Sequence, residues 1–139
     1  MPDSTASTPG STPAWYSQCL EVPSATSQID VEGVSLNYET RGETSSPGVV
    51  LIHGSNAHKE WWRFIAPLLA DQFRIAAIDL SGNGDSGWRE RYTGELFARE
   101  VWEAVGPRTW GSGRLWWATA LAAGWRCKPR ITMAMRWLG

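Results

Sequence analysis

The sequence predicts an α/β fold, in which a parallel sheet packs against helices. One observation, the alternation of strand-like and helix-like segments, carries this prediction. Strand-like apolar runs alternate with helix-like segments along residues 28–105, and strands that alternate with helices usually pair in parallel. The chain has 139 residues, of which 42% are hydrophobic and 19% are charged, as expected for one small globular domain.

The first part of this segment predicts a β-hairpin followed by a buried strand. Residues 28–32 and 35–40 each alternate apolar with polar side chains, and Gly33 lies between them, which predicts a β-hairpin. After a polar loop, residues 49–52 form a continuous aliphatic run. Such a run is typical of a parallel strand that is buried on both faces.

The next elements alternate between helix and strand. Apolar residues recur at helical spacing over residues 60–70, where Pro67 is expected to kink or break the helix. Residues 73–78 form a second buried strand that ends at Asp79, and a Gly-rich loop follows over residues 81–87. Thr93 then opens a further helix, as an N-cap residue does.

The two ends differ from this segment. Residues 1–27 are rich in Ser, Thr, Pro and Ala, so we expect a flexible, disordered N-terminal arm. The alternative is that Trp15, Tyr16 and Leu20 dock onto the domain. Residues 106–139 contain no Asp or Glu, six basic residues and five of the ten tryptophans. No helix or strand period runs through them, so we expect an irregular C-terminal tail and a sheet edge left unpaired and prone to aggregation.

The totals exclude several classes of protein. A net charge of −1 favours neither nucleic acid nor a membrane surface as a partner. Cys19 and Cys127 are the only cysteines, which is too few for a disulfide framework or a cysteine metal site, and no cofactor motif is present. We therefore expect no cofactor and no metal. The first residues do not have the pattern of a secretory signal, so we expect a cytoplasmic location.

Two motifs carry a family resemblance. Residues 48–58 read GVVLIHGSNAH and residues 73–87 read FRIAAIDLSGNGDSG. The first resembles the third strand and oxyanion loop of the α/β-hydrolase family, and the second resembles the fourth strand and the Gly-x-Gly-x-Ser loop after it. The resemblance covers residues 28–105 and is closest to the branch with epoxide hydrolases, haloalkane dehalogenases and small esterases. It implies the N-terminal part of an α/β-hydrolase sheet.

The resemblance also implies roles for individual residues. The backbone N–H of Ser55, or that of Asn56, would stabilise an oxyanion, and Gly54 would permit the turn. His53 would be a hydrogen-bonding brace, and Asp79 would brace loops. Gly82, Gly84 and Ser86 would only shape the Gly-rich loop over residues 81–87. The alternative interpretation is that His53 and Gly54 merely end a strand.

The catalytic nucleophile of that family is missing. It lies in a Gly-x-Ser-x-Gly turn, or one with Asp in place of Ser, and no serine here has glycine at both flanking positions. The two histidines, His53 and His58, both come early. We therefore expect an inactive fragment of a parent that hydrolyses a small-molecule ester, epoxide or similar substrate. The alternative is a non-catalytic binding protein that uses the Trp/Arg-rich tail.

The tail is also compatible with a displaced reading frame. Moved back by one nucleotide, the codons of Trp116, Trp117 and Ala118 encode Val and then Gly, and the following codons permit V-V-G-H-S-x-G-G. That string is a nucleophile turn. Excess tryptophan and loss of acidic residues fit the same explanation.

We predict that resequencing the gene from codon 95 onward reveals a one-base difference. Its correction is expected to restore V-V-G-H-S-x-G-G and an open frame that continues well beyond this nucleophile turn. An unchanged DNA sequence would show that the tail is genuine and would direct the search to a binding partner for residues 106–139.

Overall fold

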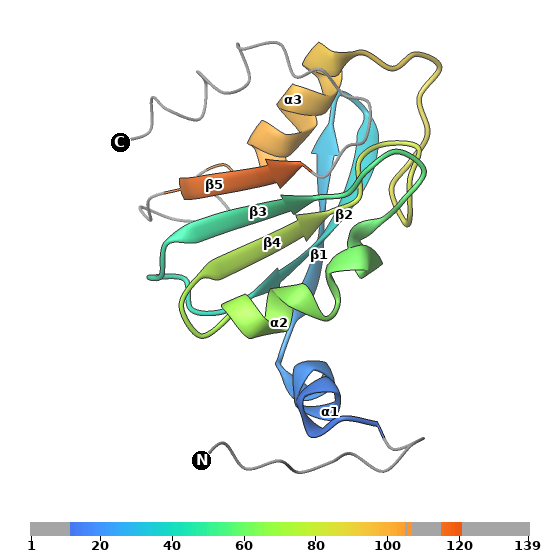
Figure 1. The fold of residues 1–139 in the computed structure, drawn as a ribbon. Helices are drawn as coiled ribbons and strands as arrows, with labels where there is room; N and C mark the ends of the chain where they lie inside the picture. Colours follow the sequence, from blue (N-terminus) through green and yellow to red (C-terminus); the bar gives the residue numbers. More distant parts are fainter. Residues whose placement is uncertain (1–11, 105, 107–114, 121–139) are drawn as a thin grey trace, which may run out of the picture.

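The computed structural model describes residues 12–104, residue 106 and, as backbone, residues 115–120. The predicted order of hairpin, strand, helix, strand, loop and helix is present, with one helix before it and one strand after it (Figure 1). In chain order the elements are α1 Ala14–Glu21, β1 Ala25–Val31, β2 Val34–Arg41, β3 Gly48–Ile52, the 3-10 helix η1 Lys59–Trp62, α2 Ile65–Leu69, β4 Arg74–Ile78, α3 Gly94–Ala104 and β5 Leu115–Ala120.

The described strands form one mixed sheet in the order β1-β2-β4-β3-β5. β1 and β2 make the predicted antiparallel hairpin, and β2 continues antiparallel to β4. β3 runs parallel to β4 on one side and to β5 on the other. The predicted α/β class with parallel strands is therefore confirmed, and the carboxyl ends of β3 and β4 lie side by side (Figure 1).

Both faces of the central strands are buried, which explains their unbroken apolar sequence. Alternate side chains point to opposite faces of a strand. Val50 and Ile52 therefore join the core cluster beneath α3, whereas Val49 and Leu51 join the cluster that contains Trp62 of η1. α2 and α3 cover opposite faces of the sheet (Figure 1).

The helix expected over residues 60–70 is divided, but the break precedes Pro67. The 3-10 helix η1 ends at Trp62, and α2 begins at Ile65. Pro67 is the third residue of α2, within the first turn, where a backbone N–H has no partner inside the helix in any case. The proline is therefore tolerated near the start of α2, and it does not end it.

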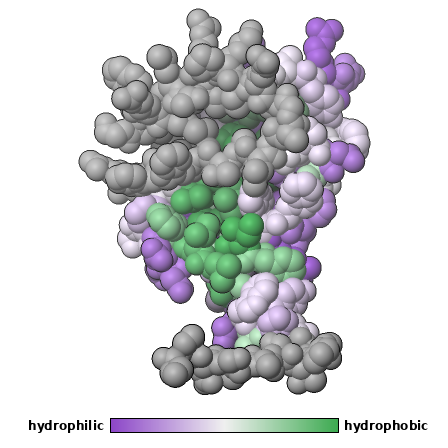
Figure 2. Space-filling view, viewed as in Figure 1, coloured by the Kyte–Doolittle hydropathy of each residue, from purple (hydrophilic) through white to green (hydrophobic). Residues whose placement is uncertain are grey.

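The outer side of these two short helices remains apolar. Trp61, Ile65 and Leu68 are 59%, 46% and 59% exposed. Figure 2 shows hydrophobic residues gathered on the face that carries α2. The outer side of η1 and α2 therefore lacks the continuous polar surface that is typical of a surface helix.

The expected N-terminal arm needs correction in its second part. Residues 14–21 form α1, and β1 already begins at Ala25. α1 is anchored on the residue before α2, because the Tyr16 ring lies 4.7 Å from the Phe64 ring and the buried Cys19 thiol donates to the Phe64 carbonyl. Of the three residues for which docking was the alternative, Tyr16 contacts Phe64, whereas Trp15 and Leu20 remain exposed. Residues 1–11 lie outside the described residues.

The expected C-terminal tail also needs one correction. Residues 115–120 are not irregular, because they form β5 in parallel with β3. Trp116, Trp117 and Thr119 are strand-favouring residue types, although they show no alternation with polar residues. The edge of β3 that was expected to be bare is therefore paired. The rest of the predicted tail, 107–114 and 121–139, lies outside the described residues.

We predict that Thr93→Ala destabilises the fold by about 1 kcal/mol, because Thr93 caps α3. Its hydroxyl oxygen accepts a hydrogen bond from the Leu96 N–H at 3.1 Å. Urea unfolding followed by circular dichroism measures the change. Thr93→Ser keeps the hydroxyl and is the matched control, so an equal loss in both variants would argue against capping.

Candidate active-site loops at the carboxyl ends of β3 and β4

The turn after β3 presents two backbone donors. Ser55 and Asn56 form a turn with exposed side chains, and Asn56 has a left-handed φ of 57°, a conformation that asparagine tolerates better than most residues. Among the described residues, neither backbone N–H has a hydrogen-bond acceptor. Gly54 and Ala57 on either side are buried, so the two open amides stand on a firmly seated loop.

His53 connects this loop to the end of β4. The Leu80 N–H donates to His53 Nε2 at 3.1 Å, and Nδ1 lies 2.8 Å from the Gly54 carbonyl oxygen. Both contacts are satisfied when the ring proton is on Nδ1, because Nε2 is then the acceptor. The ring is only 2% exposed. His53 is thus placed to hold two loops together and has no access to a substrate.

Asp79 is the centre of the second loop. Its carboxylate is fully buried and accepts three hydrogen bonds. Oδ1 accepts the Lys59 backbone N–H at 2.6 Å, and Oδ2 accepts the Lys59 ammonium at 2.9 Å and the Asp85 N–H at 3.0 Å. A carboxylate so enclosed is a structural anchor and is not available as an acid or nucleophile.

The loop after β4 is folded around that carboxylate. A Cβ at Gly84, which has φ +51°, would lie 2.3 Å from Asp79 Oδ2, so only glycine fits. The Ser86 hydroxyl donates to the Asp79 carbonyl at 2.6 Å and accepts the Asn37 N–H at 2.8 Å. Gly82 has φ +78° and lies against Tyr92. These residues shape the loop through geometry and hydrogen bonds.

Two further buried ionic residues, Lys59 and Glu100, were not predicted from the sequence. Lys59 is 6% exposed and forms ion pairs with Asp79 at 2.9 Å and with Asp85 at 2.7 Å. Glu100 of α3 is fully buried, where it accepts the Ser81 N–H at 3.0 Å and the Arg89 Nε–H at 2.9 Å. A signal for Glu100 was present, because it occupies the buried stripe of α3. Lys59 offered no such signal.

The Lys59 cluster shifts two pKa values. Burial lowers the pKa of Lys59, but hydrogen bonds to Asp85 and Asp79 and their negative charges outweigh burial and leave it raised. The hydrogen bond from Lys59, and then its positive charge, lower the pKa of the exposed Asp85 carboxyl group. Each partner therefore favours the charged form of the other.

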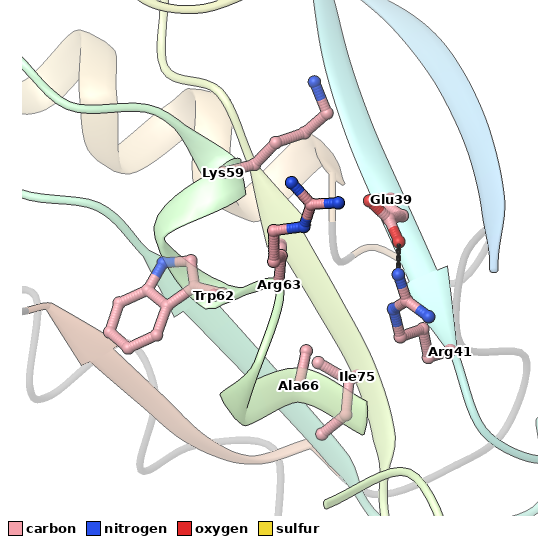
Figure 3. Close-up of a pocket in the computed structure, with 8 residues that line it drawn as sticks. Glu39, Arg41, Lys59, Trp62, Arg63, Ala66 and Ile75 are labelled. Carbon is pink, nitrogen blue, oxygen red and sulfur yellow. Dashed lines mark ion pairs between the residues drawn. The ribbon is translucent and has the colours of Figure 1, made fainter. Parts of the chain in front are cut away.

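A pocket lies on the α2 face of the sheet, and neither Ser55 nor Asn56 is among the residues that line it. Figure 3 shows it between η1, α2 and β2, with Trp62, Ala66 and Ile75 on its apolar side. Arg41 pairs with Glu39 and Lys59 pairs with Asp79 and Asp85, whereas the third cation of the lining, Arg63, lies 4.0 Å from Glu60. We assign no ligand to it.

The sequence-predicted residues thus divide into two groups. His53, Asp79 and Ser86 are brought together by direct or shared contacts at the ends of β3 and β4. Ser55 and Asn56 lie on the exposed turn next to them. Within the described part of the chain, no group of three or more His, Cys, Asp or Glu side chains could hold a metal ion, and no helix is long and apolar enough to cross a membrane.

Comparison with known proteins identifies the same segment. Residues 47–109 match the model of the alpha/beta hydrolase fold family. The chain is 40% identical over 83 residues to a pimeloyl-[acyl-carrier protein] methyl ester esterase from Sodalis glossinidius, covering 60% of this chain and 30% of that protein. A protein of the same name from Methylococcus capsulatus is 43% identical over 75 residues, covering 54% and 28%.

Solved structures of epoxide hydrolases are also similar to this chain. The Cif epoxide hydrolase from Acinetobacter nosocomialis superposes with a TM-score of 0.62 at 26% identity, covering 70% of this chain and 31% of that one. The epoxide hydrolase CorEH gives a TM-score of 0.54 at 35% identity, covering 60% and 29%. The chain spans less than a third of the length of the curated relatives that it matches first. The described strands therefore form part of an α/β-hydrolase sheet.

We predict that the contribution of Asp85 to the stability of the protein is present near neutral pH and is lost at acidic pH. A carboxyl group whose pKa is lowered by folding stabilises the protein above its unfolded pKa, about 3.9 for Asp, and this contribution disappears as pH falls through the lower folded value. The raised pKa of Lys59 works in the opposite sense. Its contribution is present below about pH 10.4 and disappears as pH rises through the folded value.

Urea midpoints measured from pH 2 to pH 7 test the acidic limb. The gap between the wild type and Asp85→Asn should be largest near neutrality and close at the acidic end. Asp71→Asn, which alters an exposed carboxylate for which the described residues show no ion pair, should follow the wild type throughout. A constant gap across the range would show that Asp85 acts without its charge.

Proposed function

We propose that this chain, which carries the N-terminal part of an α/β-hydrolase sheet, supplies the oxyanion-binding element of a hydrolase for a small ester or epoxide. One observation carries the proposal. The N–H groups of Ser55 and Asn56 stand open at the carboxyl end of β3, the edge at which sites of open α/β sheets form.

The chemistry of such a site requires fixed donors. When a nucleophile attacks an ester carbonyl, negative charge develops on the carbonyl oxygen, and N–H groups already aimed at that position lower the barrier. Ser55 directly follows His53 and Gly54 and is the first choice for this donor, with Asn56 as the alternative. The loop meets the requirement for rigidity, because His53 and Ala57 are buried on either side of the pair.

The same proposal makes the 139-residue chain inactive by itself. The chain has no Gly-x-Ser-x-Gly sequence, and Asp79 is enclosed by its hydrogen bonds. His53 is buried and engaged at both ring nitrogens. A nucleophile with its general base must therefore come from polypeptide other than these residues.

The substrate class is proposed from the relatives. The similar proteins include an esterase acting on a pimeloyl-[acyl-carrier protein] methyl ester and epoxide hydrolases. An ester substrate is favoured, because an ester generates the oxyanion that two N–H donors stabilise. The alternative role of the Trp/Arg-rich tail as a binding surface concerns residues that, apart from β5, lie outside the described part, and no observation favours it.

We predict that a chimera with an esterase relative requires the Ser55 amide. The segment of the Sodalis glossinidius esterase that this chain matches is replaced by the corresponding residues, and hydrolysis of short-chain p-nitrophenyl esters is measured. Ser55→Pro, which removes the N–H, should lower kcat by about 10²–10³-fold. Ser55→Ala keeps the N–H and should remain close to the unmodified chimera.

Circular dichroism verifies that each chimera is folded, and the 139-residue chain is assayed in parallel. Equal activity of Ser55→Pro and Ser55→Ala would refute the role of this amide. Turnover by the isolated chain that a serine-directed inhibitor abolishes would refute its proposed inactivity.

A further inference from the structure

We propose that Lys59 is a positioning residue that holds the Ser55–Asn56 turn in its donor geometry by tying the end of the loop to Asp79. The inference concerns the arrangement of the loop, and its link to oxyanion binding rests on the function proposed above. Sequence patterns did not single out Lys59, and it has no contact with the two open amides itself.

Both ends of the loop between β3 and η1 are hydrogen-bonded to the consecutive residues Asp79 and Leu80. At its start, His53 Nε2 accepts the Leu80 N–H at 3.1 Å. At its end, the Lys59 N–H and ammonium donate to the two oxygens of Asp79 at 2.6 and 2.9 Å. Both anchors follow β4 directly. The exposed turn of Ser55 and Asn56 therefore spans two fixed points that belong to one rigid strand end.

A cation is required at the second point because of burial. The Asp79 side chain is fully buried, and Lys59 is its only cationic partner among the described residues, so removal of Lys59 would leave a carboxylate in the interior with amide donors alone. An uncompensated buried charge is strongly unfavourable. The end of β4 lies in the sheet core, whereas the loop after β3 is at the surface. Without the Lys59 cation, we therefore expect the loop to move and to admit water to the Asp79 carboxylate.

Asp85 completes the arrangement from the solvent side. Its side chain is 74% exposed and accepts the Lys59 ammonium at 2.7 Å, while its own N–H donates to Asp79 Oδ2. One ammonium thus joins three segments: the loop after β3, the end of β4 and the Gly-rich loop. A residue with a merely space-filling role would not need these charge-assisted contacts.

Lys59→Met in the 139-residue chain tests the proposal without any assay of activity. Methionine is unbranched and apolar, and it removes the charge and the side-chain hydrogen bonds. Amide ¹⁵N–¹H spectra and hydrogen exchange are recorded. We expect the Ser55 and Asn56 resonances to shift and broaden, and protection of the Lys59 and Asp85 amides to fall at least tenfold. Amides within β3 and β4 should retain protection within about twofold of the wild type.

Arg63→Met is the matched control, because it removes a nearby cation that is half exposed and only 4.0 Å from its Glu60 partner. It should leave the Ser55 and Asn56 resonances unchanged. Unchanged resonances in Lys59→Met, or an equal loss of protection throughout the sheet, would overturn the positioning role. If Lys59→Met does not fold, Asp85→Asn alters an exposed partner and should move the same two resonances more than those of the sheet. Their failure to move would overturn the proposal.

These outcomes are separate from those of the proposed function. A loop that loosens in Lys59→Met, together with a chimera indifferent to the Ser55 amide, would retain the positioning of the loop and reject oxyanion binding. A loop that is unchanged in Lys59→Met, together with a chimera that depends on the Ser55 amide, would reject the positioning role of Lys59 and retain oxyanion binding.

Discussion

The burial of one carboxylate governs the arrangement at the carboxyl ends of β3 and β4. Asp79 has no access to solvent, and a charge in that position is tolerated only when its lone pairs are filled and its charge is balanced. The three N–H donors come from Lys59 and Asp85, and the Asp79 backbone bonds to Asn37 and Ser86. The turn after β3, the Gly-rich loop and the middle of β2 are therefore arranged around a single side chain.

Much of this fold could be predicted from local patterns. The hairpin, β3, β4 and α3 were found because their periods and caps are properties of short segments. The parts that were missed depend on contacts between distant segments. α1 is stabilised through Phe64, which is 45 residues from Cys19, and β5 is recognised by its pairing with β3 and not by alternation. A serine- and threonine-rich composition, or a tryptophan-rich one, does not contain that information.

The candidate site divides in the same way. His53, Gly54 and Ser55 form a contiguous motif whose backbone geometry is local, so a resemblance in sequence was sufficient to select them. Lys59 was not selected, since its importance lies in a carboxylate 20 residues further along the chain. Glu100 similarly has its partners in the loop between β4 and α3. Buried ion pairs join elements that are separate in sequence, and a periodic pattern registers their charged members only as interruptions.

The strand order has a consequence for the growing chain on the ribosome. β3 is central in the sheet, between β4 and β5, yet it is made before both of them. During synthesis, the apolar run Gly48–Ile52 therefore leaves the exit tunnel without a partner on either edge. It gains one when Arg74–Ile78 has emerged and the second only after Ala120. Such delayed, non-local pairing slows folding and prolongs the exposure of an apolar strand with unpaired edges, so the order in which the strands are made works against the order in which they pair.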